Sequence, residues 1–100
     1  MDPDLSDFMI ADVVEATAGR ETGNWYYVIA ADDAFLYLAN GKDRTLEKPK
    51  LKKRKHTQMV LRSETRVAEK LRAGDKVLNS ELRKDLAYLS REQECNATGG

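Results

Sequence analysis

Cysteine, histidine and proline are scarce in this 100-residue sequence, which holds one cysteine, one histidine and two prolines. The single cysteine, Cys95, excludes an internal disulfide and favours a reducing compartment. One cysteine and one histidine offer no metal-ligand spacing, and no glycine-rich loop of the phosphate-binding pattern is present. We therefore expect a protein that is not an enzyme, with no catalytic residues, no metal, no cofactor and no small-molecule substrate.

Long apolar runs are also absent from the chain. No stretch approaches the about 20 apolar residues that cross a bilayer. The acidic first residues lack the positive segment that opens a signal peptide. We expect a cytoplasmic protein that does not bind a membrane.

Charge is abundant and unevenly distributed, although the formal net charge is zero. Residues 1–41 carry one cation and eight anions, residues 42–62 carry nine cations and two anions, and the remainder is balanced. At 34% charged residues, above the usual quarter, much of the chain must be solvated surface. The concentrated cations favour a polyanionic partner, because clustered lysines and arginines gain affinity by releasing counterions from nucleic acid.

Short β-branched and aromatic segments separated by turns predict a small barrel of about five strands, so the fold class is mainly β with C-terminal α. The expected strands are residues 10–17, 25–31, 35–39, 42–47 and 57–61. Two glycines predict a turn-rich loop at residues 18–24, and Asp32-Asp33 is typical of a turn rather than an acid–base pair. Asn40-Gly41 predicts a type I′ hairpin.

Two short helices are expected after the barrel. Val67 and Leu71 lie one helical turn apart and Gly74 supplies a stop, while leucines at i, i+4 and i+7 from Leu82 predict a helix to about Glu92. The expected organisation is an acidic lead-in at residues 1–9, a barrel at 10–62, a helical extension at 63–94 and a disordered tail at 95–100.

Pro49 and the basic run after it carry the main functional signal. Because proline interrupts a strand ladder, we expect residues 50–56 to form a loop at one edge of the barrel and to contact phosphates. A solvated loop or a linker is the alternative. Strand alternation places Trp25 and Tyr27 on one face and Tyr26 on the other, so at least one set is core, and packing is favoured over base stacking for each aromatic.

The order of these signals resembles the KOW domain family, specifically short bacterial KOW-domain RNA-binding proteins related to large-subunit ribosomal proteins. The elements that carry the resemblance are Asp12-Val13-Val14, Ala18-Gly19-Arg20-Glu21-Thr22-Gly23, Tyr27-Val28-Ile29, Leu36-Tyr37-Leu38-Ala39-Asn40-Gly41, Glu47-Lys48-Pro49-Lys50 and Lys52-Lys53-Arg54-Lys55-His56. A helical C-terminus with Leu82-Arg83-Lys84 is also similar. The resemblance implies an SH3-like barrel of the KOW type and RNA binding in translation, with ribosomal RNA and the ribosome as partners.

The expected RNA contacts combine the glycine loop with the basic segment. By similarity, the glycine loop has a recognition role, and glycines also let a backbone approach a phosphate closely. The full set is Gly19, Arg20, Gly23, Lys42, Arg44, Lys48, Lys50, Lys52, Lys53, Arg54, Lys55 and His56.

Two other functions fit the same sequence. A protein-interaction module would use the barrel aromatics Trp25, Tyr27 and Tyr37, since small barrels bind extended peptides in aromatic grooves. Salt-sensitive association between the acidic and basic ends is the third and weakest reading. We expect the free protein to be a monomer.

Overall fold

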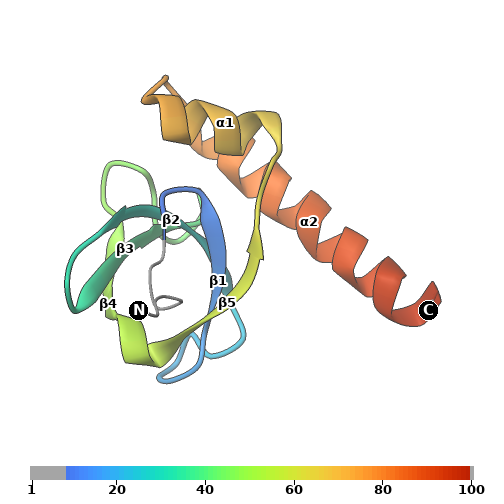
Figure 1. Ribbon diagram of the computed structural model, residues 1–100, viewed down its shortest axis with the longest axis horizontal. Helices are drawn as coiled ribbons and strands as arrows, with labels where there is room; N and C mark the ends of the chain where they lie inside the picture. The colour runs from blue at the N-terminus through green and yellow to red at the C-terminus, as the bar shows by residue number, and fades with distance from the viewer. Residues whose placement is uncertain (1–8, 100) are drawn as a thin grey trace, which may run out of the picture.

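A computed structural model describes the backbone of residues 9–99 and the side chains of residues 9–92. Figure 1 shows a curled sheet followed by two helices, the second of which extends away from the sheet. All but Met9 of the expected acidic lead-in, and Gly100, lie outside the described residues.

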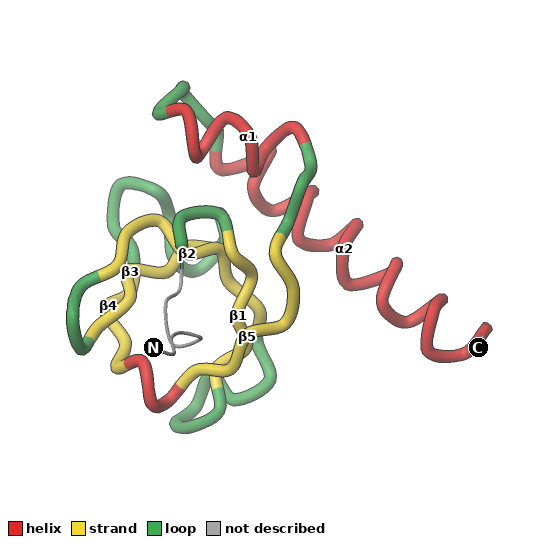
Figure 2. The backbone as a smooth tube through the Cα atoms, viewed as in Figure 1, coloured by secondary structure: helices red, strands yellow, loops and turns green. Residues whose placement is uncertain are grey.

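Five antiparallel strands form one sheet in the order β4-β3-β2-β1-β5. They are β1 (Asp12–Ala16), β2 (Trp25–Ala31), β3 (Phe35–Ala39), β4 (Lys50–Lys53) and β5 (Thr57–Arg62), with the 3₁₀ turn η1 (Arg54–His56) between the last two. The sheet curls into a ring, and η1 joins its two outer strands (Figure 2). This confirms the expected fold class, a small SH3-like barrel followed by helices.

The period of two along β2 gives the sheet two apolar faces. Tyr26 and Val28 point into the barrel, where they join a buried cluster with Val14, Leu36 and Leu38. The neighbouring Tyr27 is fully buried on the opposite face, and the partly buried Trp25 packs against the same cluster as Tyr27. The predicted division of the aromatics between two faces is confirmed, and it makes both sets part of a core.

The helices α1 (Arg66–Ala73) and α2 (Asn79–Gly99) cover the outer face of β2. Thr65 caps α1 by accepting a hydrogen bond from the Ala68 N–H, and Gly74 ends the helix with a φ of 78°. The leucine stripe of α2, Leu82, Leu86 and Leu89, is buried in the cluster around Tyr27. Among the described residues, no helix is long and apolar enough to cross a membrane.

The predicted fourth strand at residues 42–47 is wrong, because this segment is an irregular loop. The Asn40 side chain organises it, since its Oδ1 accepts hydrogen bonds from the backbone N–H groups of Lys42 and Arg44 at 2.9 and 3.0 Å. Asn40 has no positive φ, so Asn40-Gly41 is not a type I′ hairpin. The connection from β3 to β4 therefore spans residues 40–49.

The fourth strand lies instead within the basic run, which was expected to be a loop. Lys52 pairs with Leu36 in the β3–β4 register, and only 9% of Lys52 is exposed. A lysine can occupy such a position because its aliphatic stem packs against apolar neighbours while the ammonium reaches a polar end. The basic run is thus an edge strand followed by η1.

The chain beyond Glu92 also departs from the expected disordered tail, because α2 continues to Gly99. No proline or glycine interrupts residues 93–98. Each added residue then continues an existing helix, which is far easier than starting a new one. The second helix is consequently long, at 21 residues, rather than short.

Candidate nucleic-acid interface

The glycine loop at residues 18–24 is a tight turn that displays one cation. Gly19 and Gly23 have φ values of 86° and 94°, in the region that glycine adopts without strain. The Thr22 hydroxyl donates to the Gly19 carbonyl at 2.6 Å, and the Gly23 N–H donates to the Ala16 carbonyl at 2.8 Å. Arg20 lies between these fixed points with an exposed side chain.

Glu21 ties the glycine loop to the edge strand β4. Its carboxylate lies 3.3 Å from the Lys50 ammonium and 3.6 Å from that of Lys52, which also donates to the Ala18 carbonyl at 2.9 Å. A hydrogen bond from its own backbone N–H and the bond from Lys50 hold the pKa of Glu21 below its usual value. Two cations of the expected basic loop are therefore already paired with an anion.

A groove of about 440 Å³ opens between the barrel and α2. One wall of the groove is formed by the start of β2, at Trp25, and by the start of the 40–49 loop. The other wall is one face of α2. The lining residues are Asn24, Trp25, Asn40, Lys42, Asp43, Arg83, Leu86, Ala87 and Ser90. The groove exists because the leucine stripe of α2 holds the helix against the sheet.

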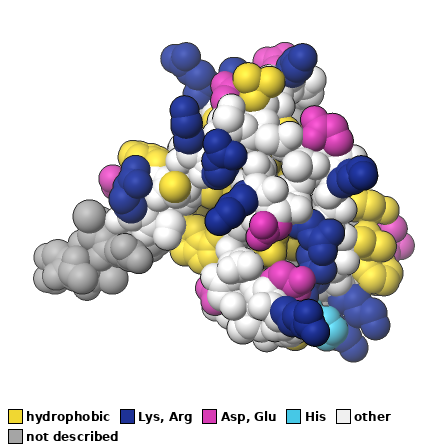
Figure 3. Space-filling model, turned by 180° about the vertical axis from the view of Figure 1, so that it is seen from behind, with side chains coloured by type: hydrophobic (Ala, Val, Ile, Leu, Met, Phe, Trp, Pro, Cys, Tyr) yellow, Lys and Arg dark blue, Asp and Glu magenta, His cyan; other side chains and the backbone are white. Residues whose placement is uncertain are grey.

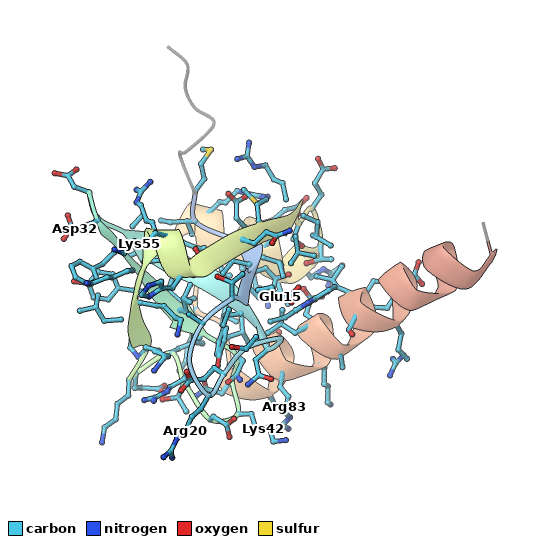
Figure 4. All side chains as sticks on the ribbon, turned by 90° about the horizontal axis from the view of Figure 1, so that it is seen from below. Glu15, Arg20, Asp32, Lys42, Lys55 and Arg83 are labelled. Atoms are coloured by element: carbon cyan, nitrogen blue, oxygen red, sulfur yellow. The ribbon has the colours of Figure 1, made fainter. Side chains whose placement is uncertain are left out.

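Two exposed cations, Lys42 and Arg83, line this groove, and a third exposed cation, Arg20, lies in the glycine loop; we name the three the groove cations. Figure 4 shows them projecting toward the same side of the molecule. Within residues 9–92, none of the three forms an ion pair. Asp43 is the one acidic side chain in the described lining of the groove.

Asn40 adds a directed hydrogen-bond donor to the groove. Its Oδ1 is occupied by the two backbone N–H groups of Lys42 and Arg44, so the amide orientation is fixed. The Nδ2 group donates no hydrogen bond within the described part of the chain. A ligand oxygen in the groove would satisfy it.

A second group of cations lies on another side of the barrel. Lys53, Arg54 and Lys55 line a hollow of about 390 Å³ with Ala34 and Asp33. Arg54 also donates through Nε to the Asp32 carbonyl at 2.8 Å. Figure 4 shows Lys55 beside Asp32, away from the groove cations.

The structure therefore divides the twelve predicted contact residues instead of gathering them. Lys42 lines the groove, and Arg20 projects toward the same side of the molecule as Lys42 (Figure 4). The others shape the glycine loop (Gly19, Gly23), belong to the 40–49 loop (Arg44, Lys48), approach Glu21 (Lys50, Lys52) or follow in β4 and η1 (Lys53, Arg54, Lys55, His56). The segregation of charge along the sequence is partly cancelled in three dimensions.

Sequence reasoning missed Arg83, Asn24 and Asn40 as groove residues. Arg83 was expected outside the apolar stripe of its helix and was given no binding role, and nothing in the sequence places it beside Lys42. The signal that the sequence offered was that Arg83 directly follows Leu82. Because Leu82 is buried, its position determines which face of α2 carries Arg83.

The fold and the groove together define a small SH3-like barrel with a helical extension and a basic groove between them. No family model matches the chain. A search of curated proteins also finds no match. In the described residues, no group of three or more His, Cys, Asp or Glu side chains could hold a metal ion.

Proposed function

We propose that this protein binds structured RNA through the groove between the barrel and α2. The observation that carries the proposal is that Lys42 of the 40–49 loop and Arg83 of α2 line one groove, while Arg20 of the glycine loop projects toward the same side of the molecule (Figure 4). Three cations on one side, none of them in an ion pair within residues 9–92, are a local concentration of positive charge in a chain of zero net charge. Such a concentration attracts a phosphate backbone and orients the docking.

The backbone around the groove is held in place before any ligand binds. The turn bonds of residues 18–24 fix the segment that carries Arg20, and the Asn40 side chain fixes the segment that carries Lys42. Arg83 follows Leu82, which is fully buried in the helix–barrel core. A backbone that is fixed before binding reduces the conformational entropy that is lost when the cations on it contact a ligand.

The other groove residues are of the types that contact phosphate and sugar. Asparagine, serine and backbone N–H groups make many of the hydrogen bonds to nucleic-acid backbones, together with arginine and lysine. The groove offers Asn24, Asn40 and Ser90 beside its cations. The resemblance to KOW-domain proteins supports ribosomal RNA as the particular partner, with a role in translation in the cytoplasm.

The competing reading as an aromatic peptide-binding module receives less support. Tyr27 is fully buried and Trp25 is partly buried, and both belong to the core between barrel and helices. Of the three aromatics that this interpretation requires, Tyr37 alone is exposed. A peptide groove needs several exposed aromatics together.

A charge-matched pair of double variants tests the proposal. Lys42→Ala/Arg83→Ala removes two groove cations, and Arg66→Ala/Lys76→Ala removes two exposed cations outside the groove. We expect the groove variant to weaken binding to ribosomal RNA fragments by at least about tenfold and to reduce the slope of log affinity against log salt by about 1.5. The control variant should keep most of the RNA affinity and most of the salt slope.

Equal losses in the two variants would show that general charge, not the groove, drives binding. Native protein that shows no salt-dependent RNA binding would overturn the proposal outright. Sedimentation of a lysate tests the ribosomal partner separately, since native protein should travel with ribosomal particles and the groove variant should remain at the top of the gradient.

A further inference from the structure

The outer face of the β3–β4 hairpin presents an apolar and cationic surface that the groove does not use. Cross-strand register places Tyr37 opposite Leu51 and Phe35 opposite Lys53, so these four side chains share one face of the sheet. We call them the hairpin strip. The intervening residues, Leu36 and Lys52, point to the barrel interior.

The helices leave the hairpin strip uncovered. They pack against the outer face of β2, on the other side of the barrel from β4 (Figure 1). Leu51 is 51% exposed and Tyr37 is 36% exposed, whereas the other aromatics of the sheet are buried or partly buried. Figure 3 shows apolar side chains gathered along this side of the barrel with Lys and Arg side chains next to them.

The strip has the geometry of a stacking platform. Residues two apart on a strand lie about 6.6–6.8 Å from each other on the same face, which sets the spacing of Phe35 and Tyr37. Exposed aromatics on a sheet surface stack successive unpaired bases in common RNA-binding modules. Lys53, directly opposite Phe35, would meet the phosphate attached to such a base.

We infer that the hairpin strip binds unpaired bases of the RNA that the groove holds by its backbone. This inference rests on the proposed function and specifies its ligand as structured RNA that continues into a single strand. Tyr37 is the central platform, Leu51 extends its apolar surface, and Lys53 supplies the cation. Lys55 and Arg54 follow Lys53 in the chain, and Asp33 lowers the net positive charge there without cancelling it.

The small size of the hairpin strip favours unpaired RNA bases as its ligand rather than a folded protein. Stable protein interfaces bury about 800 Å² on each partner, far more than three apolar side chains provide. A stacked base needs only one ring face, and each stack stabilises a single-strand complex substantially. The cation within the strip also suits a charged polymer better than an apolar partner.

Three RNA probes separate the strip from the groove: a blunt hairpin, the same hairpin with a single-stranded 3′ extension, and the extension alone. We expect native protein to bind the extended hairpin roughly 5- to 30-fold more tightly than the blunt one. Tyr37→Ala should abolish that gain and leave binding of the blunt hairpin unchanged. Tyr37→Phe should retain the gain, because it keeps the ring.

Tyr88→Ala is the matched control, since Tyr88 is an exposed tyrosine, 48% accessible, on α2. An absent gain in the native protein, or a gain that survives Tyr37→Ala, would overturn the inference. If the blunt hairpin fails to bind but the extension alone binds in a Tyr37-dependent way, the strip inference stands and the groove proposal fails. If no probe binds, both are wrong.

Discussion

The Tyr27 hydroxyl donates a hydrogen bond to the Asp85 carboxylate and so joins β2 to α2 inside the helix–barrel core. The same hydroxyl lies 2.9 Å from the Ser63 hydroxyl, and the Thr65 hydroxyl donates to Asp85 at 2.8 Å. The strand β2, the segment between β5 and α1, and the helix α2 therefore meet at one polar cluster, formed by Tyr27, Ser63, Thr65 and Asp85. Because Arg83 lies two residues before Asp85, this cluster also fixes the helix wall of the groove.

Removing the hydroxyl alone should weaken the attachment of α2. Tyr27→Phe leaves the partly buried Asp85 carboxylate with one fewer donor, and we expect the free energy of unfolding to fall by about 1–3 kcal/mol. Urea denaturation checks this value. Tyr26→Phe is the control, because Tyr26 is equally buried and makes no hydrogen bond within the described residues. A similar loss in both variants would contradict the role of the cluster.

The same hydroxyl gives stability an alkaline dependence. Burial, and then the hydrogen bond to Asp85, raise the pKa of Tyr27 to about 12, from a usual value of about 10. The folded state favours the neutral phenol, so this contribution is complete below pH 10 and is lost as the pH rises from 10 to 12. Native protein should lose stability in that window more steeply than Tyr27→Phe does. Parallel unfolding curves for the two proteins across that window would show that Tyr27 does not titrate there.

Local alternation explains why much of the sheet could be predicted from the sequence. The strands at residues 25–31 and 35–39 are confirmed with their expected bounds, because their β-branched and aromatic residues repeat with a period of two. The division of Tyr26 and Tyr27 between two faces follows from the same period. The groove could not be predicted, since it depends on α2 packing beside a loop some 40 residues earlier in the chain.

Two of the failed predictions, the hairpin at Asn40-Gly41 and the loop at the basic run, share a physical cause, which is tertiary contact overriding a local signal. Asn40-Gly41 favours a hairpin in isolation, but the Asn40 side chain binds the following backbone and α2 packs on Gly41. Lysine-rich segments favour loops, yet Lys52 points into the barrel. Its aliphatic stem packs against apolar neighbours, and its ammonium group pairs with the Glu21 carboxylate. Neither contact is visible in sequence order.

Gly41 should be intolerant of a side chain for a steric reason as well as a conformational one. A β-carbon there would lie 2.2 Å from the Asn79 carbonyl oxygen at the start of α2, and the φ is 77°. We expect Gly41→Ala to lower the free energy of unfolding by about 2–5 kcal/mol, combining backbone strain with overpacking. Calorimetric or denaturant unfolding measures the loss.

Gly23→Ala separates the two causes. Gly23 has a φ of 94°, but a β-carbon there would meet nothing within 4 Å. Strain alone should reduce stability by about 1–2 kcal/mol. Equal effects at the two glycines would mean that α2 shifts freely away from the 40–49 loop, against the close packing described above.

Glu21 should restrain RNA binding, because its carboxylate holds the ammonium groups of Lys50 and Lys52. Glu21→Gln removes the negative charge beside the glycine loop and releases the Lys50 ammonium, whereas Lys52 keeps its hydrogen bond to the Ala18 carbonyl. We expect RNA affinity to rise roughly two- to fivefold and the salt slope to steepen by about one. Titrations at several salt concentrations measure both quantities.

Glu81→Gln is the control, since Glu81 pairs with Lys70 at 3.1 Å between the helices. An affinity that falls in Glu21→Gln would instead make Glu21 a support for the loop, which phosphate binding requires intact.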